Sequence, residues 1–137
     1  MVRQATFERA IELIYFAHRA VVAEPDRVLA RRGLSRVHHR ILYCVGRRPD
    51  ITIAPLCEVL GVSKQALHRP LGELERRGLI ERRVGDNRRQ RRVRLTARGS
   101  VLEQKLMAGQ RKRIARAFRT AGPSAVAGWM RVSRLLF

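Results

Sequence analysis

The sequence predicts a mainly α-helical protein with one small β-hairpin, which makes it an α+β chain. Apolar residues recur every three or four positions through most of the chain, as they do on the buried face of a helix. Only two short runs, residues 79–84 and 91–95, have strand character, and a turn-rich, charged link joins them. With 137 residues, 45% of them hydrophobic, the chain has the length and apolar content for a small core.

The first third of the chain is expected to form two or three helices. The first covers residues 6–23, and Pro25 interrupts it. Residues 26–32 then form either a short separate helix or a kinked continuation, and Gly33 ends it because glycine accepts the left-handed conformation at a helix C-terminus. The next helix covers residues 35–46, with a serine at its N-cap.

Two closely spaced helices are expected next. Residues 52–60 form the first, and Gly61 follows where the turn needs a positive φ. Ser63 caps the second, which reaches about Arg77. Pro70 lies inside this second helix, so it removes one backbone hydrogen bond and should bend the helix or force a local adjustment.

Two long helices are expected after the hairpin. Thr96 caps the first, which reaches about Thr120, and Gly122-Pro123 separates it from the last one. The expected order is therefore three or four helices, a hairpin and two final helices.

The charge balance indicates a polyanionic partner. The chain has 30 Lys and Arg residues against 11 Asp and Glu residues, a net charge of +19. Such an excess favours nucleic acid, because binding is driven by phosphate neutralisation and counterion release. An anionic membrane surface would attract the same excess of positive charge. However, no apolar run has the length of a membrane span, and the N-terminus lacks a signal-peptide core. We therefore expect a cytoplasmic protein without a membrane partner.

No pattern in the chain indicates catalysis, a metal or a cofactor. Cys44 and Cys57 lack zinc-finger spacing and are expected to be buried as small hydrophobic residues, with no redox role assigned. His38 and His39 are adjacent, so on a helix their side chains point about 100° apart and do not chelate one ion. Catalytic triads, phosphate loops and paired acids are missing, which argues against an enzyme.

Residues 52–77 have the features of a helix-turn-helix. Cys57 is small where the two helices must pack closely, and Gly61 suits the turn. The second helix would present its N-terminal half to the major groove of DNA. Its outward side chains include types that read bases, since glutamine pairs with adenine and arginine or lysine with guanine. These candidate recognition residues are Ser63, Lys64, Gln65, His68 and Arg69.

The arginine-rich hairpin is a candidate wing. Seven arginines lie within residues 82–94, and they are expected to repel one another without a polyanion. An arginine-tipped ribbon fits a narrow minor groove, where the negative potential is enhanced. Asp86, the only acid at the tip, is expected to pair with Arg88 or to cap the turn. The candidate wing residues are Asp86, Arg88, Arg89 and Arg91.

Three blocks of sequence carry a family resemblance. They are residues 60–67 (LGVSKQAL) with 74–80 (LERRGLI), then Asp86-Asn87-Arg88, and finally residues 95–99 (LTARG). They resemble the recognition-helix block, the Asp-x-Arg wing motif and the Leu-Thr-x-x-Gly motif of the MarR family of bacterial transcription regulators. Chain length and helix order are similar too, so the resemblance covers essentially the whole chain.

The resemblance implies a homodimer on a pseudo-palindromic site in double-stranded DNA, more commonly as a repressor. It divides a single unit, residues 1–137, into a winged helix-turn-helix lobe at 34–96 and dimerisation helices at 1–33 and 97–137. The alternative is that the terminal helices fold back on their own core. The resemblance also implies a small-molecule effector pocket, whose candidate residues are Tyr15, His18, Arg19, His38 and Tyr43.

Two other classes of protein would use the same charge. A non-specific, architectural nucleic-acid-binding protein would show steep salt dependence and no preferred sequence. A protein–protein adaptor would dock an acidic partner on the winged lobe. The regulator is the interpretation that also accounts for the paired helices and the hairpin.

Overall fold

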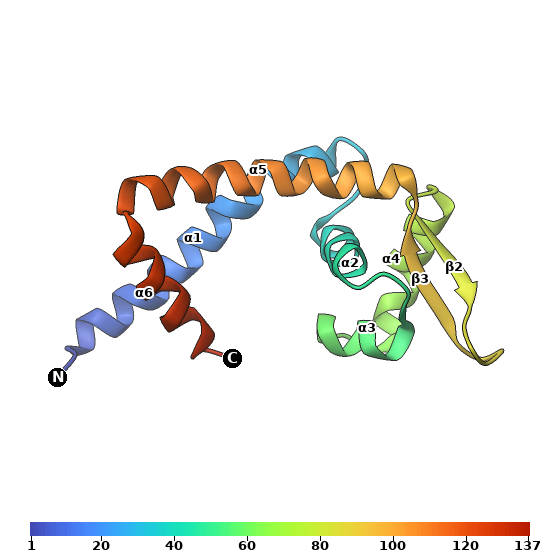
Figure 1. Cartoon of the computed structure of the whole chain (residues 1–137), viewed down its shortest axis with the longest axis horizontal. Coiled ribbons are helices and arrows are strands. Elements are labelled where there is room, and N and C mark those ends of the chain that lie inside the picture. Colours follow the sequence, from blue (N-terminus) through green and yellow to red (C-terminus); the bar gives the residue numbers. More distant parts are fainter. The chain divides into compact units, whose positions relative to one another are not determined.

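The computed structural model describes all residues, 1–137, as six helices and three strands (Figure 1). None of the helices combines the length and the apolar character that crossing a membrane requires. The expected fold class, mainly helical with a small β-hairpin, is confirmed. The elements are α1 (Gln4–Ala30), α2 (Arg36–Arg47), β1 (Ile51–Thr52), α3 (Ile53–Leu60), α4 (Lys64–Arg76), β2 (Ile80–Val84), β3 (Arg91–Leu95), α5 (Ala97–Ala121) and α6 (Pro123–Arg134).

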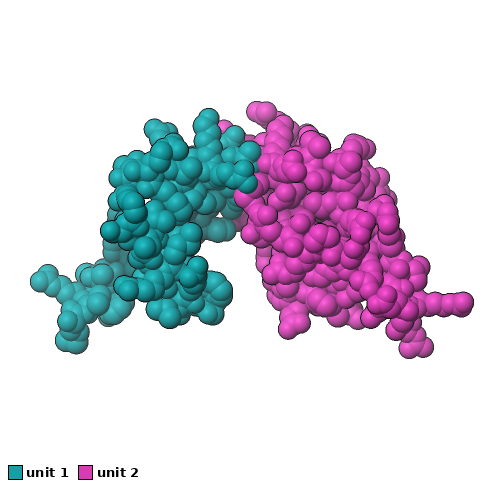
Figure 2. All heavy atoms as spheres, viewed as in Figure 1, with its two compact units in different colours: residues 1–24, 108–137 teal, residues 25–107 magenta.

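The chain divides into two compact units, drawn in two colours in Figure 2. The terminal unit consists of residues 1–24 and 108–137, and the winged unit consists of residues 25–107. Helices α1 and α5 each contribute residues to both. The winged unit contains the whole of the expected helix-turn-helix lobe, residues 34–96, together with the adjoining turns of its flanking helices.

Helix α1 does not stop at its proline. It continues from Gln4 to Ala30 with Pro25 inside, so the separate second helix was a wrong alternative and the continuation is correct. The proline costs one backbone hydrogen bond, but its ring and Leu29 are buried, and this packing keeps the last turns helical. Gly33 follows with a φ of 67°, as expected for a helix C-terminus.

The sheet has three strands, where the sequence predicted only a hairpin. Strands β2 and β3 pair in antiparallel fashion with Ile80 opposite Leu95, and the two-residue strand β1 adds to the other edge of β3, with Ile51 opposite Val93. A strand of two residues has no alternation to detect, and its pairing is decided by contacts distant in sequence. Strand β1 therefore corrects the sequence prediction.

The hydrophobic core lies in the winged unit. Leucines from α2, α3 and α4 fill it together with Val93 of β3 and the first turns of α5. Cys44 and Cys57 are buried in this core, which confirms their expected role as small hydrophobic residues. The fully buried side chains are Leu29, Ile41, Leu42, Leu56, Leu67, Leu71, Leu74, Ile80, Leu102, Leu106, Val45 and Val93.

The start of α5 is bound tightly to the end of the helix-turn-helix. The Thr96 hydroxyl donates to the Gly78 carbonyl at 2.6 Å and accepts from the Gly99 amide at 3.1 Å, which confirms Thr96 as a cap. A Cβ on Gly99 would lie 1.8 Å from the carbonyl oxygen of Leu79. The glycine of the Leu-Thr-x-x-Gly motif therefore lets the helix backbone reach the backbone before β2.

Candidate nucleic-acid interface

The turn between α3 and α4 is built as the sequence predicts. Gly61 has a left-handed conformation, with φ 67° and ψ 36°, and the Ser63 hydroxyl accepts from the Ala66 amide at 3.0 Å. A contact that sequence reasoning missed also holds the turn, because Arg40 of α2 donates to the Leu60 carbonyl at 2.7 Å. The end of α3 is thus tied to α2 before the chain enters α4.

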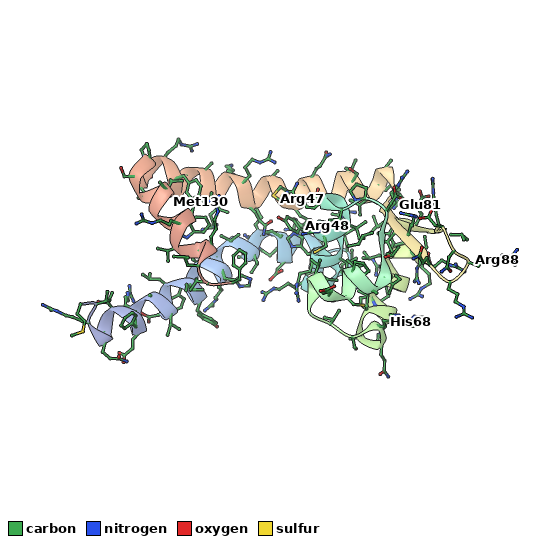
Figure 3. All side chains as sticks on the ribbon, turned by 60° about the horizontal axis from the view of Figure 1, so that its bottom comes forward. Arg47, Arg48, His68, Glu81, Arg88 and Met130 are labelled. Carbon is green, nitrogen blue, oxygen red and sulfur yellow. The ribbon has the colours of Figure 1, made fainter.

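Helix α4 has one buried face and one exposed face. Leu67, Leu71 and Leu74 are buried in the core. The five candidate recognition residues, Ser63, Lys64, Gln65, His68 and Arg69, are all exposed. The structure brings them together on the outward side of the N-terminal half of the helix, and His68 projects from it in Figure 3. Their contact with bases stays a prediction.

Pro70 does not end α4. The helix runs from Lys64 to Arg76 with Pro70 inside it and the proline ring buried. Proline has no amide hydrogen, so the Ala66 carbonyl loses its helical partner. Burial of the ring against the core offsets that loss and keeps the chain helical beyond the recognition residues.

The hairpin of β2 and β3 extends beyond the helices of the winged unit, with Arg88 at its tip (Figures 1 and 3). Arg88 and Arg89 are exposed, and their guanidinium groups make no hydrogen bond or ion pair with the rest of the chain. Arg91 instead folds over the tip and donates to the carbonyls of Arg88, at 2.7 Å, and Gln90, at 3.1 Å. The tip therefore presents two free cations on a braced turn.

The expected pairing of Asp86 with Arg88 is wrong. Asp86 accepts from Arg92 at 2.7 Å, and the turn is capped by Asn87, whose side-chain oxygen accepts from the Arg89 amide at 2.7 Å. The hairpin geometry explains the difference, because Asp86 comes two residues after the end of β2, close to the start of β3, while Arg88 lies farther along the loop.

Acidic residues hold four of the seven wing arginines. The pairs are Arg82–Glu75, Arg83–Glu81, Arg92–Asp86 and Arg94–Asp50. The expectation that the whole set repels without a polyanion was therefore too strong. The unpaired charge is concentrated near the tip, where contact with DNA is geometrically open.

Asp50 and Arg94 fasten the base of the wing. Two nitrogens of Arg94 donate to the two carboxylate oxygens of Asp50, at 3.1 and 2.5 Å, and this hydrogen bonding lowers the pKa of Asp50. Asp50 also has a φ of 66°, and its amide donates to the Val93 carbonyl. Asp50 was not among the residues expected in the site, although aspartate is one of the side chains that tolerates this conformation.

The five candidate effector residues fall in both units. Tyr15, His18 and Arg19 are exposed residues of the terminal unit, and Tyr43 is in the winged unit with the Arg47 guanidinium 4.9 Å from its ring centre. His38 of the winged unit is buried and hydrogen-bonded through both ring nitrogens. The pocket that these residues were expected to line stays a prediction.

Another hollow exists on the winged unit. It has a volume of about 290 Å³ and contains none of the five effector candidates. Its lining residues are Arg32, Leu79, Ala97, Arg98, Val101 and Leu102. No group of three or more His, Cys, Asp or Glu side chains in the chain is arranged to hold a metal ion.

Comparison with known proteins gives a consistent result. Residues 32–91 match the model of the MarR family. The chain is 45% identical over 125 residues to the HTH-type transcriptional regulator PetP of Rhodobacter capsulatus, covering 90% of this chain and 75% of PetP.

Solved structures are similar as well. A MarR family transcription regulator has a TM-score of 0.80 at 26% identity, with 96% of this chain and 88% of the other covered. The transcriptional regulator MOSR of M. tuberculosis, solved in complex with DNA, has a TM-score of 0.62 at 28% identity, with 93% and 90% covered. The family model, the curated relative and the shared fold agree, and this chain belongs to the MarR family of winged helix-turn-helix transcription regulators.

Proposed function

We propose that this DNA-binding regulator binds a pseudo-palindromic operator as a homodimer and represses transcription there. In each copy, α4 lies in the major groove and the wing lies in the adjacent minor groove. The observation that carries the proposal is the pair of exposed surfaces on one unit, the outward face of α4 and the arginine tip of the hairpin. The likeness to a regulator solved on DNA supports it.

The residues divide by the contacts open to them. Gln65 has both a donor and an acceptor free to read adenine, and Lys64 is free to contact guanine or phosphate. Ser63, whose hydroxyl caps the helix, and His68 lie beside them on the exposed side of α4. Arg69 supplies a guanidinium at the far end of the same face.

In the wing, Arg88 and Arg89 enter the minor groove. Asp86 and Arg91 act from behind them, because both are engaged in holding the turn. In this division the free cations, Arg88 and Arg89, contact bases or phosphates. Asp86 and Arg91 maintain the shape of the hairpin turn.

The homodimer is supported by apolar side chains that one copy leaves exposed. Phe7 is 53%, Ile11 69% and Trp129 54% exposed, and α6 has no buried residue. Such side chains on the terminal helices favour cover by a second copy, since large exposed apolar patches mark interaction sites. They count against the alternative in which these helices fold back on the chain's own core.

An effector that releases the operator is part of the proposal. Tyr15, His18 and Arg19 of the terminal unit and Tyr43 of the winged unit are exposed and free to contact a small molecule, and His38 of the winged unit is bonded to α4. Any compound that binds the DNA-incompetent arrangement better would lower operator occupancy.

The test is selection of binding sites from random duplexes, followed by footprinting. We expect two half-sites about one helical turn, ~10 bp, apart. Arg88→Ala should weaken binding to the selected site strongly, and Gln65→Ala should relax base preference at one position per half-site by about 1–3 kcal/mol. Arg131→Ala is the matched control, because it removes the same charge from an exposed arginine of α6.

Three results separate the alternatives. Equal binding of selected and random duplexes at about 0.15 M salt would identify a non-specific architectural protein. Capture of an acidic protein partner that persists after nuclease treatment, with no selected site, would identify an adaptor. A selected site bound by one copy only would refute the homodimer.

A further inference from the structure

A chain of hydrogen bonds connects the start of α2 with the exposed face of α4. It begins at Ser35, the residue before α2, whose backbone amide donates to Nδ1 of His38 at 3.0 Å. His38 thus occupies the position where a glutamate or glutamine usually completes a capping box. The histidine side chain is only 7% exposed.

The geometry determines which nitrogen of His38 carries the proton. A backbone N–H can only donate, so Nδ1 must offer its lone pair and the ring proton of the neutral histidine is on Nε2. That nitrogen lies 2.6 Å from a carboxylate oxygen of Glu73 in α4. His38 therefore donates to Glu73, and the one ring links the cap of α2 to the recognition helix.

Glu73 passes the connection to the DNA-facing surface. Its other oxygen accepts from Nε of Arg69 at 3.0 Å, one turn earlier in α4. The Glu73 side chain is 27% exposed and the Arg69 side chain is 88% exposed, so the series runs from the interior to the surface. With Nε bound to Glu73, the two terminal amino groups of Arg69 are left to face outward.

The Arg69–Glu73 pair lies on the turn that follows the hydrogen bond lost at Pro70. The helical bond to the Ala66 carbonyl is missing because proline cannot donate it. The Arg69–Glu73 ion pair supports the next turn, residues 69–73, from the outside, and the His38–Glu73 bond anchors that turn to α2.

We propose that Glu73 and His38 are positioning residues that hold Arg69 in the orientation needed for base readout, so that they determine sequence preference without touching DNA. This inference rests on the proposed function, because it assigns a specificity role within the α4 surface. Glu73 is otherwise an unfavourable residue to have near a duplex, since its carboxylate repels phosphates.

That repulsion makes the sign of the effect diagnostic. If Glu73 contributed charge alone, its neutralisation would strengthen binding to every duplex. If it positions Arg69, its neutralisation weakens binding to the selected site while binding to random DNA stays equal or increases. The specificity ratio then falls, which a purely electrostatic role cannot produce.

The test variant is Glu73→Gln, which preserves shape and can still accept from His38 through its amide oxygen. Its amide nitrogen cannot accept from Arg69, so that link breaks. Glu75→Gln is the matched control, because it removes an equal charge from α4 at a glutamate that pairs with Arg82 instead. We expect the ratio of selected-site to random-duplex affinity to fall about 5–20-fold for Glu73→Gln and to remain unchanged for Glu75→Gln.

A double-mutant cycle with Arg69→Ala separates positioning from general destabilisation. The Glu73→Gln effect should disappear in the Arg69→Ala background, and thermal unfolding should show both variants folded. His38→Glu gives a second route, because it keeps an acceptor for the Ser35 amide and drives Glu73 away by like charge. An unchanged ratio in a folded Glu73→Gln or His38→Glu variant, or an effect that persists without Arg69, overturns the inference. A wild-type protein that selects no site overturns the proposed function instead.

Discussion

The two units of this chain bury apolar side chains to very different degrees. In the winged unit, Leu29, Leu56 and Leu74 have no exposed surface, while in the terminal unit Val22 is the one buried hydrophobic side chain. A buried core stabilises the first unit without help from outside. The second keeps large apolar side chains such as Ile11 in water, so its stability must come from another surface.

The comparison indicates a division of labour. The unit with its own core carries the groove-facing residues, which must keep a fixed geometry. The unit without one carries the surfaces expected to join two copies, and these remain exposed until a partner covers them. Substitutions in the winged unit should therefore affect different measurements from substitutions in the terminal unit.

The largest effect is expected for Gly99→Ala in the winged unit. The new Cβ would lie 1.8 Å from the Leu79 carbonyl oxygen, which is backbone and cannot turn away. Helix α5 would have to move from the strand start, and we expect a loss of about 3 kcal/mol or more in the free energy of unfolding. Urea denaturation measures it, and wild-type stability in this variant would show that the junction is looser than described.

The next effect is expected for Ile11→Asp in the terminal unit. A charge placed in an apolar contact between copies loses its hydration, so the dissociation constant of the dimer should increase about 100-fold or more. Sedimentation across a concentration series measures this. The melting of the winged unit should stay unchanged, and Glu12→Gln, on the same turn, serves as the control. Equal dimer stability in both variants would remove Ile11 from the interface.

A smaller and pH-dependent effect is expected for Asp50→Asn at the base of the wing. The hydrogen bond from Arg94 lowers the pKa of Asp50 in the folded state. A carboxyl whose pKa is lowered by folding stabilises the fold at pH values above its pKa in the unfolded state. That contribution is lost as the pH falls through its pKa in the folded state. Asparagine keeps the shape and tolerates the positive φ but cannot carry the charge.

The stability difference between wild type and Asp50→Asn should therefore be greatest near neutral pH and should shrink in acid. Thermal unfolding from neutral pH to below the ordinary range of aspartate measures it. A difference that is the same at every pH would mean that the charge on Asp50 does not contribute.

The smallest effect, and the only stabilising one, is expected for Gly128→Ala in α6. Nothing lies within 4 Å of the Cβ that would be added, so alanine fits and lowers the entropy of the unfolded chain. We expect a gain of about 0.5–1 kcal/mol in the free energy of unfolding. A loss instead would show that a second copy packs closely on this glycine.

Much of the site could be predicted from local sequence. Ser63, Gly61 and Thr96 act on backbone within a few residues, so their capping and turn roles follow from residue type and position. The exposed recognition face follows from helical periodicity, because the leucines of α4 define its buried side. The three sequence blocks that resemble MarR-family motifs then connected these local features to DNA binding.

The errors concern partners that lie far apart or depend on register. Proximity in sequence predicted that Asp86 either pairs with Arg88 or caps the turn, whereas its partner in the fold is Arg92 of β3. The Glu73–His38 bond joins residues 35 positions apart, and the only local sign of it was a histidine three residues after Ser35. Strand β1 was missed for the same reason.

The sequence by itself determined the helices, the hairpin, their caps and the concentration of arginine on the wing, because periodicity, capping and charge are properties of neighbouring residues. Tertiary structure alone decided which arginines are paired and which are free, and that Arg69 connects through Glu73 to the buried His38. Ion pairs and cross-helix hydrogen bonds require specific atoms to meet within about 3 Å. Only the packing of the folded elements brings those atoms together.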